Sequence, residues 1–168
     1  MKKTLIVVDM QNDFIDGALG TGEAVAIVDN VKAKIENYRK SGDEIIFTRD
    51  THGENYLETS EGKKLPVEHC IKGAYGWEIA EGLCEEGDTI IDKPSFGWTG
   101  WGDYNFDEIE IVGLCTDICV VSNALILKAT FPDVPITVDA RCCAGVNPAT
   151  HKAALETMKM CQINVEGE

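Results

Sequence analysis

The sequence is short of positive charge and of long apolar runs. Lysine and arginine supply 15 of the 168 residues, against 29 aspartates and glutamates, so the formal net charge is −14. A surface this acidic repels phosphate backbones and anionic membranes, and we expect neither nucleic acid nor a membrane as a partner. No apolar stretch reaches the roughly 18 residues of a membrane-spanning helix. The apolar run at the start is also too short for a signal peptide, because Asp9, Asn12 and Asp13 interrupt it. We therefore expect a cytoplasmic protein.

Nucleotide-binding fingerprints are missing as well. Gly20 and Gly22 follow the first apolar run, but the third glycine of a dinucleotide-binding loop would stand at position 25, which is Val25. No Walker A sequence occurs either. The seven cysteines are odd in number and irregularly spaced, which argues against a disulfide framework and a zinc finger. Most of these thiols are expected to be small buried groups.

What the sequence does contain is an alternation of strand and helix patterns. With 44% apolar residues, the chain is long enough for one domain with its own core, spanning residues 1–168. Continuous apolar runs typical of buried parallel strands lie at 3–9, 44–48, 88–92, 108–113, 135–139 and 162–165. Helical patterns lie at 23–40, 76–85, 117–129 and 147–160. This order predicts a three-layer α/β/α domain around a mostly parallel sheet of about six strands.

Three reactive side chains stand near the ends of predicted strands. Asp9 ends the first strand, Lys93 follows the third and Cys119 follows the fourth. Parallel strands end at one edge of the sheet, which is where open α/β sheets bind their ligands. The irregular segments 10–22, 49–75 and 93–106 are expected to form the rim of that site. A nucleophile, a base and a cation placed together would satisfy the demands of covalent catalysis.

The surroundings of Cys119 favour a reactive thiol. Thr116 and Asp117 are natural helix N-caps, which would place Cys119 in the first turn of a helix. The positive end of the helix dipole lowers a thiol pKa, and a nearby Lys93 would lower it further. Asp9 could accept the thiol proton and return it to a leaving amine.

At this point the sequence resembles the isochorismatase-like cysteine hydrolases, a family that includes nicotinamidases. The similar segments are VVDMQNDF at 7–14, DKPSFG at 92–97 and GLCTDICV at 113–120. The resemblance covers nearly the whole chain, and the three segments occur in the family's order. The resemblance implies the family's fold and hydrolysis of a small amide through a thioester intermediate.

The resemblance also implies roles for individual residues. The family's triad of aspartate, lysine and cysteine corresponds to Asp9, Lys93 and Cys119. The family's non-proline cis peptide would fall between Leu114 and Cys115. Its oxyanion hole would then use the backbone N–H groups of Cys115 and Cys119.

A metal site is expected beside the triad. Asp50 and His52 lie two residues apart beyond the second strand, and His69 could fold back to meet them. Two imidazoles and one carboxylate suit a divalent ion such as zinc, with positions left for water or substrate. Glu58 and Glu61 are both candidates for a fourth ligand. The pattern resembles the nicotinamidase metal site, where the ion holds the pyridine nitrogen and so orients the carboxamide over the cysteine.

The substrate pocket and the exact reaction are less constrained by the sequence. Phe14, Trp98 and Trp101 are candidates for apolar walls, although the two tryptophans could equally belong to the core or to a subunit interface. Nicotinamide hydrolysis to nicotinate and ammonia is the first expectation. Ureido or carbamoyl amides and isochorismatase-type hydrolysis are alternatives within the family. A ligand-binding member without activity and a flavodoxin-like redox protein are alternatives outside it. By the same resemblance, we expect a homo-oligomer, either a dimer or a tetramer.

Overall fold

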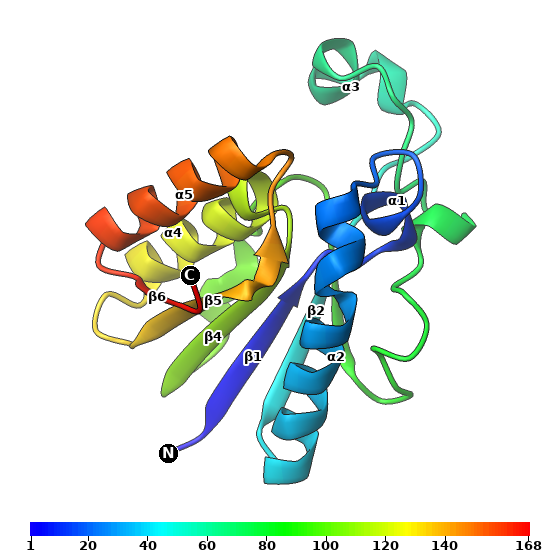
Figure 1. Cartoon of the computed structure of the whole chain (residues 1–168). Coiled ribbons are helices and arrows are strands. Elements are labelled where there is room, and N and C mark those ends of the chain that lie inside the picture. Colours follow the sequence, from blue (N-terminus) through cyan, green and yellow to red (C-terminus); the bar gives the residue numbers. More distant parts are fainter.

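A parallel sheet of six strands forms the centre of the molecule. The computed structural model describes residues 1–168 and confirms the predicted α/β/α architecture (Figure 1). The strands are β1 (Lys3–Val8), β2 (Glu44–Asp50), β3 (Thr89–Lys93), β4 (Glu108–Leu114), β5 (Ile136–Ala144) and β6 (Asn164–Glu166). Their order in the sheet is β3-β2-β1-β4-β5-β6, and every pair is parallel.

Helices cover both faces of this sheet. In Figure 1, α2 lies on one face, and α4 and α5 lie side by side on the other. The α-helices are α1 (Asn12–Ile15), α2 (Gly22–Ser41), α3 (Ser60–Lys64), α4 (Val121–Thr130) and α5 (Pro148–Met160). Short turns of other helix types are η1 (Tyr56–Glu58), η2 (Tyr75–Trp77), η3 (Gly100–Asp103) and η4 (Thr116–Val120). At the start of α5, Asn147 caps the helix through its side chain and Pro148 occupies the first turn, where its missing N–H costs nothing. None of the helices combines the length and the apolar character that crossing a membrane requires.

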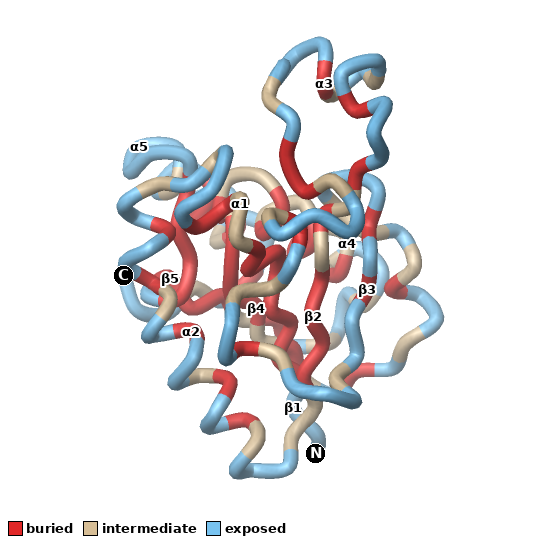
Figure 2. The backbone as a smooth tube through the Cα atoms, turned by 90° about the vertical axis from the view of Figure 1, so that its right-hand side faces the viewer, coloured by how far each residue is buried: buried red, intermediate tan, exposed pale blue.

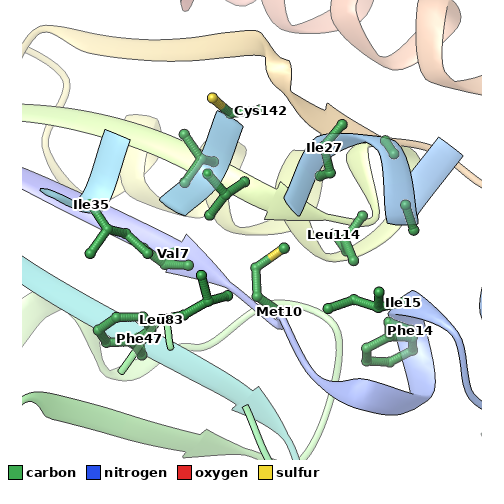
Figure 3. Packing of buried hydrophobic residues seen from close by; sticks show 14 of the residues in the cluster. Val7, Met10, Phe14, Ile15, Ile27, Ile35, Phe47, Leu83, Leu114 and Cys142 are labelled. Carbon is green, nitrogen blue, oxygen red and sulfur yellow. The ribbon is translucent and has the colours of Figure 1, made fainter. Parts of the chain in front are cut away.

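The continuous apolar runs of the strands follow from this two-sided cover. In β1, Leu5 and Val7 pack toward α2, whereas Ile6 and Val8 pack toward α4 and α5. All four side chains are fully buried, because successive residues of a strand point to opposite faces. Figure 3 shows part of the α2-side core, including Val7, Ile35 and Phe47.

The strand order creates a site at one edge of the sheet. From β1 the chain adds β2 and β3 in one direction, and then β4, β5 and β6 in the other. The carboxyl ends of β1 and β4 therefore lie side by side where the order reverses, a point at which open α/β sheets commonly bind ligands. The segments after β1, β2, β3 and β4 all meet there.

The helix predicted at 76–85 is wrong. Only the single turn η2 forms, and Ile79 instead makes an antiparallel bridge with Gln11. The N–H of Ala80 donates to the carbonyl of Met10, and the carbonyl of Glu78 accepts from the N–H of Asn12. Because this backbone pairs with the segment after β1, its polar groups are not available for a helical ladder.

A buried ionic cluster between α2 and the sheet gives a first test of stability. The Asp139 carboxylate, with its side chain 1% exposed, lies 2.9 Å from the Lys34 ammonium and 3.0 Å from Arg141. Burial alone would raise the pKa of Asp139, but Arg141 and Lys34 lower that pKa to about 2. Since the pKa is depressed in the folded state, Asp139 stabilises the protein above its unfolded pKa of about 3.9, and this contribution is lost as the pH falls toward 2.

We expect Asp139→Asn to lower the free energy of unfolding by about 1–3 kcal/mol at pH 7. The difference from the wild type should shrink below about pH 4, where the wild-type carboxylate begins to protonate. Urea unfolding at several pH values between 7 and 3 measures this difference in the free energy of unfolding. The exposed Asp133→Asn is the control, and a difference that does not change with pH would contradict the assignment.

Candidate active site

The structure brings Asp9, Lys93 and Cys119 together at the carboxyl edge of the sheet. Asp9 follows β1, Lys93 is the last residue of β3, and Cys119 lies in η4 after β4. The Lys93 ammonium lies 2.7 Å from Oδ2 of Asp9, and both side chains are completely buried. Oδ1 of Asp9 accepts a hydrogen bond of 2.7 Å from the hydroxyl of Thr48. The three reactive residues were predicted from the sequence, but Thr48 was not, because nothing about its position in β2 indicates a role.

The turn that presents Cys119 depends on a close approach between β1 and β4. Gly113 has a φ of 121°, and a Cβ there would lie 2.1 Å from the carbonyl oxygen of Val8. Only glycine fits this position, because any side chain would collide with the neighbouring strand. The peptide bond between Leu114 and Cys115 is cis, at the position that the resemblance implies. The backbone N–H of Cys115 donates no hydrogen bond to another part of the chain, so it is free to bind an anionic oxygen.

The predicted capping by Thr116 and Asp117 is wrong. The turn η4 is a π-helical turn without a side-chain cap, and it runs directly into α4. The hydroxyl of Thr116 lies 2.7 Å from Nδ1 of His151, and the Asp117 carboxylate accepts a hydrogen bond from the N–H of Val146. Both side chains therefore tie the nucleophile turn to α5 and to the segment before it.

The predicted low thiol pKa is also corrected by the structure. Burial raises the pKa of Cys119 well above its usual range, and the carboxylates of Asp9 and Asp50 raise it further. Lys93 acts in the opposite direction but does not outweigh them. Burial likewise raises the pKa of Asp9, although Lys93 opposes this shift. The resting nucleophile is thus a neutral thiol, beside a carboxylate that has become a stronger proton acceptor.

Four potential metal ligands form a second cluster beside these residues. One ligand atom each from Asp50, His52, Glu61 and His69 lies within 4.8 Å of the others. Nε2 of His52 lies 2.9 Å from Asp50 and 3.2 Å from Glu61, and Nε2 of His69 lies 3.5 Å from Asp50. The three residues predicted as ligands meet, and Glu61 joins them. Glu58 lies outside this cluster and is exposed.

Hydrogen bonding and charge prepare this cluster for a cation. Nδ1 of His69 donates to the carbonyl of Val67, so Nε2 is the ring nitrogen that faces the cluster, where it lies 3.5 Å from Asp50. Burial alone would lower the pKa of His52, but the carboxylates of Asp50 and Glu61 raise it to about 9. Burial would raise the pKa of Asp50, but the two histidines and Lys93 hold it below its usual range.

Glu61 comes from an arm that stands away from the rest of the molecule. Figures 1 and 2 show α3 and the segments on either side of it projecting beyond the sheet and its helices. At the base of the arm, Tyr56 packs edge-on against the rings of His52 and His69. A Cβ on Gly62 would lie 2.0 Å from the carbonyl oxygen of Tyr56, so glycine at this position lets α3 approach η1 closely.

Residues of the segment after β1 support the same cluster, a role that sequence reasoning missed. The side-chain amide of Gln11 is fully buried, accepts from the N–H of Asp50 and donates to the carbonyl of Asp50. The carboxylate of Asp13 accepts from the N–H of Cys70, the residue next to His69. These contacts hold the backbone at two of the potential ligands. The only signal in the sequence was that both residues belong to VVDMQNDF at 7–14.

The aromatic side chains predicted as pocket walls fall into different places. The Phe14 ring lies 5.6 Å from the ring of His69, measured between centroids, and so adjoins the ligand cluster. Trp101 is completely buried in the core beneath α4, so its prediction as a wall of an open pocket is wrong. Trp98 packs edge-on against Trp101 and Tyr104 and is partly exposed. Core packing is the physical reason that the tryptophans cluster in this segment.

Comparison with known proteins adds an independent line of evidence. A family model described as the isochorismatase domain matches residues 3–166. A nicotinamidase/pyrazinamidase from Mycobacterium tuberculosis is 26% identical over 187 residues, covering 97% of each chain. A probable inactive nicotinamidase from Arabidopsis thaliana is 31% identical over 177 residues, covering 92% of this chain and 87% of the relative. The crystal structure of a pyrazinamidase from Pyrococcus horikoshii in complex with zinc superposes with a TM-score of 0.86, at 26% identity and full coverage of both chains.

Proposed function

The chain belongs to the isochorismatase family, and from this premise we propose that it is a cysteine amidohydrolase that converts nicotinamide to nicotinate and ammonia. The position of Lys93 carries the proposal. Its ammonium lies 2.7 Å from Asp9, the proposed base, and 3.9 Å from Asp50, a potential metal ligand. The catalytic residues and the ligand cluster therefore share one cation. A substrate whose amide reaches Cys119 while its ring nitrogen reaches the cluster would use both.

The residues of the cluster fit a divalent metal ion. Oδ1 of Asp50 and Oε2 of Glu61 are buried and accept no hydrogen bond, although Lys93 Nζ lies 3.9 Å from the first and His52 Nε2 lies 3.2 Å from the second. Buried carboxylate oxygens that accept no hydrogen bond are costly, and a bound cation would satisfy both of them. Two imidazoles and two carboxylates are the donor set that zinc accepts, and a zinc complex exists for the Pyrococcus horikoshii relative. Asp50, His52, Glu61 and His69 would hold the ion, which when bound would supply a fixed electrophile for a ring nitrogen.

The chemical steps follow from the protonation of the resting site. Asp9 accepts the proton of the Cys119 thiol as the sulfur attacks the amide carbon, and the free N–H of Cys115 donates to the developing oxyanion, together with that of Cys119. Asp9 then passes the proton to the leaving nitrogen, and ammonia departs from a thioester. Asp9 removes a proton from water, which attacks the thioester and breaks the carbon–sulfur bond, and Asp9 returns this proton to the sulfur of Cys119 as the acid leaves. Lys93 stays charged throughout and holds Asp9 in place.

The arginines disfavour an acidic substrate of the isochorismatase type. Such a substrate would call for cationic groups in the pocket. Arg39 is paired with Asp88, Arg141 with Asp139, and Arg49 pairs with Asp92 while stacking on a tryptophan ring. These three are all the arginines in the chain, and each has its partner outside the site.

One relative of this chain is described as a probable inactive nicotinamidase, so the proposal is tested by a direct measurement of activity. The test is ammonia release from nicotinamide by the purified protein, with and without added zinc or manganese, with Cys119→Ala as the blank. Metal-dependent release above the blank would support the proposal. If the protein releases ammonia from a ureido amide but not from nicotinamide, nicotinamide is not the substrate, although the protein is still a cysteine hydrolase.

The choice of Glu61 over Glu58 gives a prediction for metal binding. Glu61→Gln is expected to weaken zinc binding by at least about tenfold, because the variant replaces a carboxylate oxygen with a neutral amide oxygen. Glu58→Gln is the matched control, since Glu58 lies on the same arm but is exposed. Calorimetric titration of the metal-free protein with zinc measures both affinities. Equal affinities in the two variants would remove Glu61 from the ligand set.

A further inference from the structure

One buried side chain outside the triad and the ligand cluster contacts both the turn of Cys119 and the segment after Lys93. Asn123 lies in α4, one turn beyond Cys119, and is completely buried. Its Oδ1 accepts hydrogen bonds from the backbone N–H of Trp98 at 2.9 Å and from Nε1 of Trp101 at 3.0 Å. Its Nδ2 donates to the carbonyl of Phe96 at 3.1 Å and to the carbonyl of Cys119 at 2.9 Å.

These four bonds use the full hydrogen-bonding capacity of a primary amide. A buried asparagine whose four partners lie on two segments of the chain is costly to assemble unless every bond forms. No apolar residue of similar shape could make any of these contacts. The arrangement is therefore specific to asparagine, rather than a consequence of packing.

The contacts matter because of what the bonded segments hold. The Lys93 ammonium donates to the carbonyl of Ser95 at 3.0 Å, and Ser95 immediately precedes Phe96, one of the partners of Asn123. On its other side, Asn123 holds the carbonyl of the nucleophile itself. The amide thus connects the backbone next to the Lys93 ammonium with the backbone of Cys119.

We propose that Asn123 is a positioning residue for amide hydrolysis, which holds the Cys119 turn and the segment after Lys93 in one fixed relative position. The proposal rests on the function proposed above. Asn123 touches neither the substrate nor the ligand cluster and acts only through the groups that it holds. A displacement of about 1 Å between reacting groups can lower the rate about a hundredfold. The hydrogen bonds of Asn123 should therefore affect turnover, because they fix the position of the Cys119 turn.

The principal test is Asn123→Leu, which keeps the approximate shape and removes all four hydrogen bonds. We expect kcat to fall by about 10- to 100-fold. KM should change by less than about threefold, because the ligand cluster that binds the ring is not in contact with Asn123. Zinc affinity should equal that of the wild type, which separates loss of positioning from general damage to the fold.

Two further variants keep the test decisive. Of the four hydrogen bonds, Trp101→Phe removes only the one from the indole to Oδ1 and keeps those to Cys119 and Phe96, so its kcat should stay within about threefold of the wild type even though the core loses volume. Asn123→Asp keeps oxygen acceptors but lacks the amide N–H groups that reach Cys119 and Phe96. Its kcat should fall as in Asn123→Leu, and it replaces that variant if the leucine protein does not fold.

A readout that needs no substrate separates this proposal from the proposed function. The rate at which iodoacetamide alkylates Cys119, followed by mass spectrometry of the peptide, should fall in Asn123→Leu and not in Trp101→Phe. If the wild type releases no ammonia from nicotinamide, the proposed substrate is wrong, and the alkylation rates still decide the role of Asn123. Unchanged kcat and alkylation in Asn123→Leu, or equal losses in Trp101→Phe, would overturn it.

Discussion

Cys119→Ala is expected to lower ammonia release by at least about ten-thousand-fold, because removal of a covalent nucleophile leaves only binding and the oxyanion donors. The change removes one sulfur atom from a buried position in the core beside α4. We expect it to alter the free energy of unfolding by only about 1 kcal/mol. Zinc binding should be unaffected, because Cys119 is not one of the four potential ligands.

The matched control for this experiment is Cys161→Ala. Cys161 is exposed at the end of α5 and has no part in the site. Its variant should retain the activity of the wild type. Ammonia release by Cys119→Ala at more than about one hundredth of the wild-type rate would contradict the assignment of Cys119 as the nucleophile.

Lys93→Met is expected to lower the free energy of unfolding by about 3–5 kcal/mol, in addition to abolishing most of the activity. The reason is the charge that remains. Asp9 and Asp50 are buried with Lys93 as the cation between them, and its removal leaves Asp9 without a counter-ion near the Asp50 carboxylate, which keeps only its two histidine partners. The pKa of Asp9 should then rise further, and an Asp9 that is already protonated in the resting site cannot accept the thiol proton.

A double-mutant cycle isolates this effect. The double variant Asp9→Asn, Lys93→Met removes one carboxylate together with the cation, and it should be more stable than Lys93→Met alone. Urea unfolding of the four proteins in the absence of metal gives the coupling free energy. Costs that simply add would show that the ion pair of 2.7 Å contributes no net stability, and would contradict the account of Lys93.

Some predictions from the sequence stay predictions. The expected dimer or tetramer is one, and light scattering coupled to size-exclusion chromatography would decide it. The role of Trp98 as a pocket wall is another, since its ring is partly exposed and also packs on Trp101.

The sequence by itself determined the architecture and the identity of the reactive groups. Short apolar runs without alternation favour buried parallel strands, and the six predicted runs overlap all six strands of the structure. Because parallel strands end at one edge, the positions of Asp9, Lys93 and Cys119 after their strands predicted that they meet. The proximity of Asp50 and His52 could be predicted for the same reason, because residues at the end of a strand are held at the edge of the sheet.

Only the tertiary structure decided the features that depend on segments distant along the chain. The choice of Glu61 over Glu58 depends on how the arm folds back at Gly62, which no local pattern specifies. The segment at 76–85 has a helical pattern but pairs with the segment after β1, because tertiary hydrogen bonds outweigh a weak local propensity.

The thiol shows the same distinction in its electrostatics. From the sequence, the helix start and Lys93 indicated a lowered pKa for Cys119, since both effects are local and visible. Burial and the approach of Asp9 and Asp50 reverse that shift, and both arise only when β1, β2 and β4 assemble. The identity of the chemical groups could thus be predicted from the sequence, whereas their charge states depend on desolvation by residues brought together from the whole chain.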